Sequence, residues 1–175
     1  LSTGIRYNYD ENYGSHVSPR IYGIYNLNDF FALKGGVSTG YATPDIKQRT
    51  QDLALPFAGG RGAQLGRSSL KPETSVSYEF GGVYNDNEGF EASLTGFYTS
   101  FKDMLSYSPI CSRGSVCRHK GKIYPNGIWE SVNIGKAEIY GVELTNEWQV
   151  TNALRLNQSY VYTRSKKMER RSAKV

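Results

Sequence analysis

The stretch EIYGVELTNEWQV, residues 138–150, alternates between apolar and polar side chains over nearly its whole length. One parity carries Tyr140, Val142, Leu144, Trp148 and Val150, with Asn146 as the exception. A period of two puts successive side chains on opposite faces of an extended strand. The stretch therefore predicts a strand that has one face in apolar surroundings and the other face in water.

Six further stretches repeat this alternation, some of them more weakly. They are residues 5–9, 20–27, 31–41, 75–84, 92–101 and 154–163. No apolar run approaches the roughly 20 residues that a membrane-spanning helix needs. If the chain meets a membrane, the sequence predicts that it does so with strands, about seven of them.

The connections between these strands are short and long in alternation. Residues 26–29, 85–89 and 151–153 are compact and rich in Asn, Asp and Gly, whereas residues 10–19, 42–72 and 106–131 are long and hydrophilic. Because antiparallel strands reverse direction, all short turns fall at one end of the sheet, as in outer-membrane barrels. A soluble antiparallel sandwich would show similar alternation, but nothing in it requires this sorting. The predicted fold class is all-β, an antiparallel transmembrane β-barrel segment.

The composition fits this fold and argues against nucleic-acid binding. The chain of 175 residues has 14 Tyr, a ring that suits the boundary between lipid and water. Its mean hydropathy is -0.53 and its net charge is +5. The Lys and Arg residues are scattered apart from one run between Lys166 and Lys174. We expect residues 1–165 to form the barrel segment and residues 166–175 to form a separate basic tail.

Motifs that suggest an enzyme or a metal site lack their required context. The GVSTG stretch at residues 36–40 matches a nucleophile elbow, but no helix signal follows it. The GRGAQLG stretch at residues 60–66 resembles a phosphate-binding loop, but its glycine spacing matches neither the Rossmann form nor the P-loop form. Cys111 and Cys117 are too few for a zinc site, and their spacing favours a disulfide in an oxidising compartment. We expect no catalytic residue, no metal and no cofactor.

The two longer hydrophilic connections hold the candidate ligand-binding residues, which are basic or aromatic. The third long connection supplies Arg113, Arg118, His119, Lys120, Lys122, Tyr124 and Trp129, and the second supplies Lys47, Arg49, Arg61 and Arg67. Such a surface can attract an anionic aromatic ligand by charge, stacking and cation–π contact. Contact with lipopolysaccharide, or simple solubility, is the alternative interpretation of the same residues.

Four pieces of sequence, taken in order, resemble TonB-dependent outer-membrane receptors. They are SPR at residues 18–20, LKGGVSTGYATP at 33–44, LKPETS at 70–75 and NIGKAEIYGVEL at 133–144. Within that family the chain looks most like the ferric catecholate siderophore receptors, the group that contains the enterobactin and colicin I receptors. The stretch YATPDIK departs from the form typical of haem receptors, so the resemblance favours a siderophore over haem, which stays the alternative within the family.

The resemblance implies a 22-stranded barrel plugged by an N-terminal domain, which imports a ferric siderophore with energy relayed by TonB. The siderophore would be a transported ligand and not a cofactor. The chain matches only a late barrel segment, without the plug domain, so we expect no transport by the chain alone. The implied partners are TonB through the plug, outer-membrane lipid and lipopolysaccharide, and a colicin or phage. A soluble or surface β-domain, acting as an adhesin or binding an acidic glycan, is the alternative from another class.

Overall fold

The computed structural model describes residues 1–51 and 54–168. The elements are β1 (Ser2–Asp10), β2 (Gly14–Asn26), β3 (Phe31–Ala42), α1 (Ile46–Arg49), β4 (Ala54–Phe57), β5 (Gly62–Leu65), β6 (Glu73–Asn85), β7 (Phe90–Cys111), β8 (Arg118–His119), β9 (Lys122–Ile123), β10 (Ile128–Thr151) and β11 (Leu154–Met168). Within these residues, no helix is both long and apolar enough to cross a lipid bilayer.

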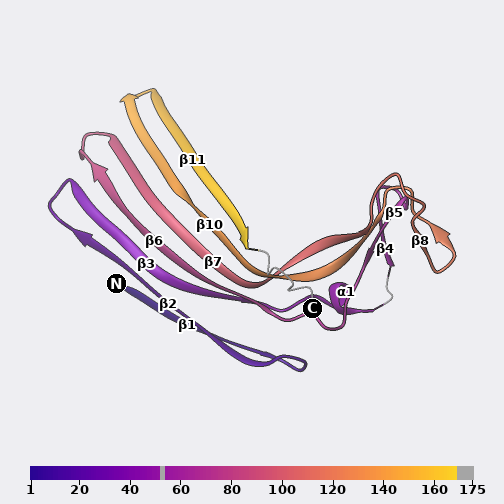
Figure 1. The fold of residues 1–175 in the computed structure, drawn as a ribbon. Coiled ribbons are helices and arrows are strands. Elements are labelled where there is room, and N and C mark those ends of the chain that lie inside the picture. The colour runs from indigo at the N-terminus through magenta and orange to yellow at the C-terminus, as the bar shows by residue number, and fades with distance from the viewer. Residues whose placement is uncertain (52–53, 169–175) are drawn as a thin grey trace.

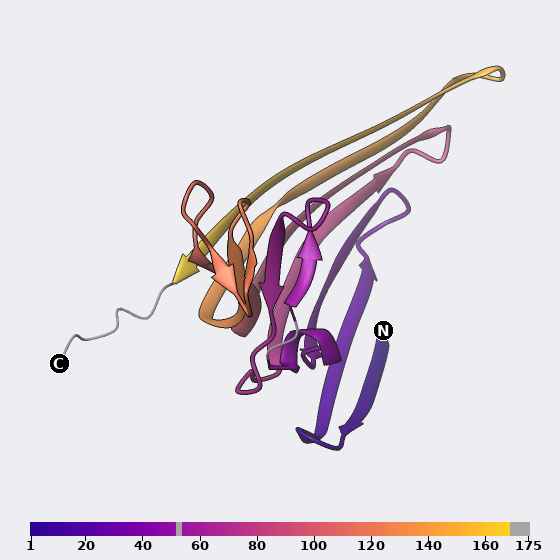
Figure 2. The ribbon, with the colours of Figure 1, turned by 90° about the vertical axis from the view of Figure 1, so that its right-hand side faces the viewer.

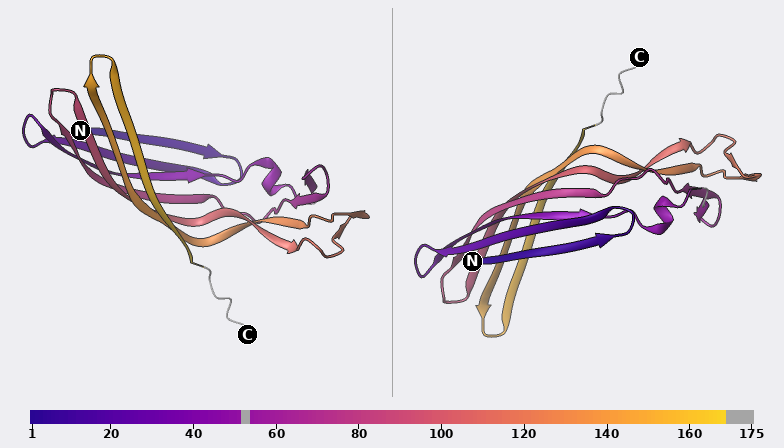
Figure 3. Two further views of the ribbon diagram at one scale, coloured as in Figure 1. Left: turned by 90° about the horizontal axis from the view of Figure 1, so that it is seen from above. Right: turned by 90° about the horizontal axis from the view of Figure 1, so that it is seen from below.

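Seven long strands build one antiparallel sheet in the order of the chain. The order is β1-β2-β3-β6-β7-β10, and β11 pairs with the other side of β10. Strand β1 and strand β11 therefore form the two edges of the sheet, which stays open (Figures 1 and 3). The all-β class and the seven predicted strands are confirmed.

The three connections that the sequence predicted to be short lie together at one end of this sheet. The hairpins β2–β3, β6–β7 and β10–β11 turn at one end, and α1, β4, β5 and β8 lie at the opposite end (Figure 1). Asp86 shows why the middle turn is compact, because its carboxylate accepts the backbone N–H groups of Glu88, Gly89 and Phe90 at 2.8 to 2.9 Å. An Asp side chain that satisfies successive amides in this way favours a tight turn.

The prediction of a long connection at residues 10–19 is wrong. Strand β1 pairs with β2 down to Asp10 and Gly14, so only residues 11–13 form the turn. Gly14 has a φ of 75°, which a glycine adopts without strain. The Asp10 carboxylate accepts the Asn12 amide at 2.8 Å. Gly14 thus begins β2 directly after a compact turn of three residues.

Strands β7 and β10 are also longer than the sequence predicted. They have 22 and 24 residues, whereas about 9 to 11 tilted residues cross the hydrocarbon. The predicted connection at 106–131 therefore shrinks to residues 112–127. Strand β11 continues past Arg164 to Met168, with Lys166 paired to Glu138. The division at residue 165 stays a prediction, because residues 169–175 lie outside the described part.

The sheet has one apolar face, crossed by rows of register partners. One row consists of Ile21, Val37, Tyr78, Tyr98 and Tyr140. A second row, nearer the short turns, consists of the rings of Phe31, Tyr84, Phe90 and Trp148, with neighbouring centroids 4.8 to 6.4 Å apart. Aromatic residues at both margins of an apolar band are typical of membrane barrels.

The opposite face is polar. Lys34 Nζ donates to Ser93 Oγ at 2.8 Å across this face, and Ser77 Oγ lies 3.0 Å from Thr99 Oγ1. Glu79 and the other carboxylates of this parity need water around them, which a barrel lumen supplies.

Candidate ligand-binding loops

The two longer connections form one body beyond the end of the sheet. Strand β5 pairs in parallel with the start of β10, and Ala63 lies opposite Ile128. Two backbone bonds extend this joint: Ala63 N–H donates to the Gly127 carbonyl at 3.1 Å, and Asn126 N–H donates to the Arg61 carbonyl at 2.8 Å. Figure 2 shows β4, β5 and β8 side by side in front of the long strands. Segments about 65 residues apart in the chain are therefore fixed to one another.

A small buried cluster holds this body together. Its members are Ala63, Cys117, Tyr124 and Ile128, with exposed fractions of 0, 1, 6 and 5%. Ala54, Leu65 and Cys111 pack against it. Because the cluster draws on both connections, neither connection can move far without exposing apolar surface of the other.

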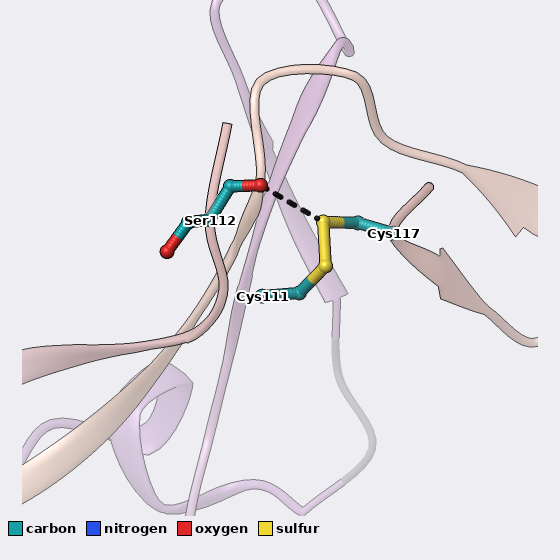
Figure 4. Close-up of a disulfide and its surroundings, with 3 residues drawn as sticks. All are labelled: Cys111, Ser112 and Cys117. Carbon is teal, nitrogen blue, oxygen red and sulfur yellow. Dashed lines mark hydrogen bonds between the residues drawn. A yellow bond between two sulfur atoms is a disulfide. The ribbon is translucent and has the colours of Figure 1, made fainter. Parts of the chain in front are cut away.

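A disulfide closes the base of the third connection. Cys111 and Cys117, which the sequence predicted to pair, are bonded, with their Cα atoms 5.7 Å apart. The carbonyl oxygen of Ser112 lies 3.5 Å from Cys117 Sγ (Figure 4). The Tyr124 amide donates to the Cys117 carbonyl at 2.8 Å. The bridge thus anchors the residues on either side of the β8–β9 hairpin to the end of β7.

The outermost part of this body is a tip that carries cations from both connections. We use "the tip" for residues 58–62 and 112–127. Lys122 Nζ lies 4.0 Å from the position that a Cβ atom on Gly60 would take, so the two connections meet there. Lys122 Nζ also lies 5.5 Å from the centre of the Tyr124 ring. The basic side chains of the tip are those of Arg61, Arg113, Arg118, Lys120 and Lys122.

No acidic residue lies in either tip segment. Arg61, Arg113, Arg118 and Lys122 are all exposed at this end of the molecule. Like charges gathered without intervening carboxylates produce a positive potential that attracts anions from solution. The structure therefore brings together the predicted cations of the third connection and Arg61 of the second.

The other predicted cations, Lys47, Arg49 and Arg67, lie outside the tip. Arg49 is the last residue of α1. Its Nη1 lies 3.8 Å from Asp10 Oδ1, and its Cζ lies 6.0 Å from the centre of the Tyr13 ring. Hydrogen bonds from the backbone and the side chain of Asn12, followed by the charge of Arg49, hold the pKa of Asp10 below its usual value. Lys47 lies in the same helix.

Arg67 also has an acidic partner, because its Nη1 lies 3.4 Å from a Glu130 oxygen. An exposed pair of this kind adds little stability. The pair nevertheless ties the end of β5 to β10.

The aromatic residues of the predicted set differ in what they can contact. Trp129 remains 39% exposed, whereas Tyr124 is buried in the cluster and presents no free ring face. His119 Nε2 is buried and has no hydrogen-bond partner among the described residues.

Sequence reasoning missed Asn133, which fastens the second connection to β10. Its side chain accepts the Lys71 amide at 2.8 Å and donates to the Lys71 and Asp103 carbonyls at 2.9 and 2.7 Å. No spacing in the sequence signals such a contact, because its partners are 62 and 30 residues away.

The metal and enzyme motifs that the sequence analysis considered do not form sites in the described part of the chain. Among residues 1–51 and 54–168, no group of three or more His, Cys, Asp or Glu side chains is placed to hold a metal ion. Ser38 lies within β3 and Gly62–Leu65 form β5, so neither sequence motif has the turn that its chemistry requires. What remains is a cationic, partly aromatic surface above a sheet with one apolar face.

The sequence model described as "TonB dependent receptor-like, beta-barrel" matches residues 1–173. The chain belongs to this receptor family. The match runs past residue 165, beyond which the sequence predicts a separate basic tail. Membership in a receptor family agrees with the expectation that the chain has no catalytic residues. It also favours a barrel segment over a soluble glycan-binding domain.

Named relatives support the same assignment. An "Iron-regulated outer membrane virulence protein" of Vibrio cholerae is 38% identical over 165 residues, which are 94% of this chain and 25% of that protein. A solved siderophore receptor, PirA from Pseudomonas aeruginosa, superposes with a TM-score of 0.77 at 22% identity over 94% of this chain and 31% of that chain. The likeness to PirA shows the fold alone.

A further structure is a variant of the ferric enterobactin receptor of Pseudomonas aeruginosa in complex with enterobactin. It matches with a TM-score of 0.68 and 27% identity, over 92% of this chain and 24% of that chain. The chain spans about a quarter of the length of the curated Vibrio cholerae relatives that it matches. It forms part of an outer-membrane β-barrel.

Proposed function

We propose that this chain supplies part of the ligand-capturing surface of a receptor that takes up a ferric siderophore of the catecholate type. The observation that carries the proposal is the tip, where the β5–β10 pairing brings cations of two connections together without a carboxylate. A ferric tris-catecholate is an anion with aromatic rings. It therefore matches both the charge of the tip and the exposed ring of Trp129.

Capture would begin with long-range attraction and continue with contact. The positive potential of the tip raises the local concentration of an anionic chelate and its rate of association. Arginine guanidinium groups can then lie against the catecholate rings. Passage through the barrel, driven by TonB through a plug domain in the intact receptor, is part of the same proposal. It rests on family membership.

The test removes charge from the tip of the full-length receptor that contains this segment. Arg61, Arg113 and Arg118 are replaced together by Ala, and Arg155→Ala is the matched control at the short-turn end, where Arg155 pairs with Glu147 at 2.9 Å. Association of a ferric tris-catecholate is followed by stopped flow at low and at high salt. We expect a roughly tenfold slower association in the triple variant at low salt, and a smaller difference at high salt.

An uncharged ferric chelate gives the decisive comparison. If the triple variant slows the anionic and the uncharged chelate equally, the tip acts through its shape, and charge-based capture is wrong. Unchanged association of the anionic chelate would also refute the proposal. The Arg155→Ala receptor should behave as the wild type with both chelates.

A further inference from the structure

Strands β7 and β10 extend past the rest of the sheet as a two-stranded arm. Within the described residues, β6 stops pairing with β7 at Lys102, and β11 stops pairing with β10 at Lys136. Beyond these residues β7 and β10 remain paired with one another. We use "the arm" for residues 104–111 and 128–134. The arm carries the tip at its far end, and Figure 1 shows its two ribbons reaching β5 and β8.

A left-handed residue lies at the base of the arm. Asp103 has a φ of 55°, whereas an extended strand has a φ of about −140°. The left-handed region is crowded for any residue with a Cβ atom, although Asp enters it more readily than most. In the register Asp103 lies opposite Gly135, with paired residues on both sides. One residue of this kind redirects the strand, so the conformation of Asp103 sets the direction of the arm relative to the sheet.

The side chain of Asn133, on β10, holds this backbone. Its Nδ2 donates to the Asp103 carbonyl at 2.7 Å and to the Lys71 carbonyl at 2.9 Å, and its Oδ1 accepts the Lys71 amide at 2.8 Å. An asparagine side chain offers one amide oxygen and one amide nitrogen, so both atoms are engaged. Glu73 adds a further bond, because its Oε2 accepts the Leu105 amide at 2.8 Å. Side chains from β10 and β6 therefore fix the base of the arm from both sides.

The segment that Asn133 binds on its other side is itself anchored. Leu70, next to Lys71, is only 3% exposed. Its carbonyl accepts the hydroxyl of Tyr13, in the turn between β1 and β2, at 3.0 Å. Asn133 thus ties the arm to a part of the second connection that has its own contacts with the rest of the chain.

A small rotation at the base displaces the tip by a large distance. Residues 104–111 of β7 span about 26 Å at the usual rise of a strand. A rotation of about 10° at Asp103 moves the far end of that span by roughly 5 Å. Hydrogen bonds form over a range of about 0.5 Å, so contacts with a bound ligand are lost. Charge attraction acts over about 8 to 10 Å at moderate salt and survives the same displacement.

We propose that Asn133 is a positioning residue for capture of the chelate: it keeps Asp103 left-handed and thereby fixes the angle at which the arm presents the tip. This role rests on the proposed function of the tip. The attraction that starts capture depends on the charges of the tip, and Asn133 adds none. The contacts that retain the chelate depend on where the tip lies, so Asn133 governs retention.

The test compares Asn133→Ala with the wild type in the full-length receptor, and Asn146→Ala is the matched control. Asn146 lies on the same strand, and its side-chain oxygen has no hydrogen-bond partner among the described residues. Stopped flow follows association and dissociation of a ferric tris-catecholate. We expect about tenfold faster dissociation from Asn133→Ala, with the association rate and its salt dependence unchanged. Asn146→Ala should behave as the wild type in both phases.

Hydrogen exchange follows the two partners of Asn133 separately. Asn133→Ala should speed exchange at the Lys71 and Leu105 amides. Asn133→Asp keeps an oxygen for the Lys71 amide but has no donor for the Asp103 carbonyl. Only Leu105 should then exchange faster, and the chelate should still dissociate faster than from the wild type. This variant also carries the test if Asn133→Ala does not fold.

A second substitution distinguishes positioning from simple loss of contacts. Glycine adopts a left-handed φ without strain. Asp103→Gly, added to Asn133→Ala, should therefore restore slow dissociation of the chelate and slow exchange at Leu105. Exchange at Lys71 should stay fast, because its acceptor is still missing.

Two results would overturn this inference. If Asp103→Gly restores neither rate, Asn133 does not act through Asp103. If the chelate leaves Asn133→Ala as slowly as it leaves the wild type, Asn133 has no part in retention. The proposed function fails by a different result, namely unchanged association after loss of the three tip arginines.

Discussion

Loss of the disulfide between Cys111 and Cys117 should loosen the tip and leave the long strands unaffected. The bridge closes a loop with a sequence separation of 6. The chain-entropy relation assigns about 2 kcal/mol to such a loop. The free energy that opens the cluster around Ala63 and Tyr124 should fall by this amount, because Cys117 belongs to the cluster. The open form then becomes about thirty times more populated.

Hydrogen exchange at the Tyr124 amide measures this opening, because that amide donates to the Cys117 carbonyl at 2.8 Å. The measurement compares the wild type with Cys111→Ala and Cys117→Ala together. The wild type under a reductant gives the effect of the crosslink without any loss of buried atoms. Exchange at Tyr124 should be about thirtyfold faster in both cases, while amides shared by β6 and β7 keep their rates.

Val116→Ala is the matched control, because Val116 lies inside the same loop but is 73% exposed. It should leave exchange at Tyr124 unchanged. Equal exchange in oxidised and reduced wild type would show that packing alone orders the tip, and the loop-entropy argument would fail. Faster exchange in the β6–β7 amides would show that the tip and the barrel open together.

Two further predictions concern the strands and their turns. Asp86→Asn should speed amide exchange at Glu88, Gly89 and Phe90, because the carboxylate accepts all three amides. These bonds hold the pKa of Asp86 below 3.8, so wild-type protection should persist above pH 3.8 and be lost as the pH falls through the lowered value. Gly141→Val should separate β11 from β10, because a Cβ on Gly141 would collide with the Tyr162 carbonyl oxygen. Gel mobility before and after heating should then reveal little folded receptor, while Gly82→Val should fold.

The alternation of side chains predicted the part of the fold that lies within the apolar band. It succeeded there because lipid on one face and water on the other demand opposite parities, as in the stretch from Tyr140 to Trp148. Above the band both faces of a strand are wet, and the alternation disappears. For that reason the sequence placed connections at residues 10–19 and 106–111, where the structure has strands.

The candidate site was predictable in residue type but not in grouping. A basic composition revealed Arg61, Arg113 and Arg118, and the spacing of the cysteines revealed the disulfide. The partners of Arg49 and Arg67 lie 39 and 63 residues away, and such contacts depend on how strands align. Tyr124 looked like a surface ring because it lies in a connection that is mostly hydrophilic, whereas the cluster that buries it includes Ala63 and Ile128.

The parallel pairing of β5 with β10 allows the exposed residues of this surface to change during evolution. Backbone N–H and carbonyl groups make that joint, and every residue type except proline carries both. Exposed side chains such as Arg118 and Lys120 can therefore be exchanged by mutation while their scaffold persists. A receptor exposed to antibodies or viruses can therefore change the side chains that they contact and keep the backbone scaffold of its ligand-binding loops.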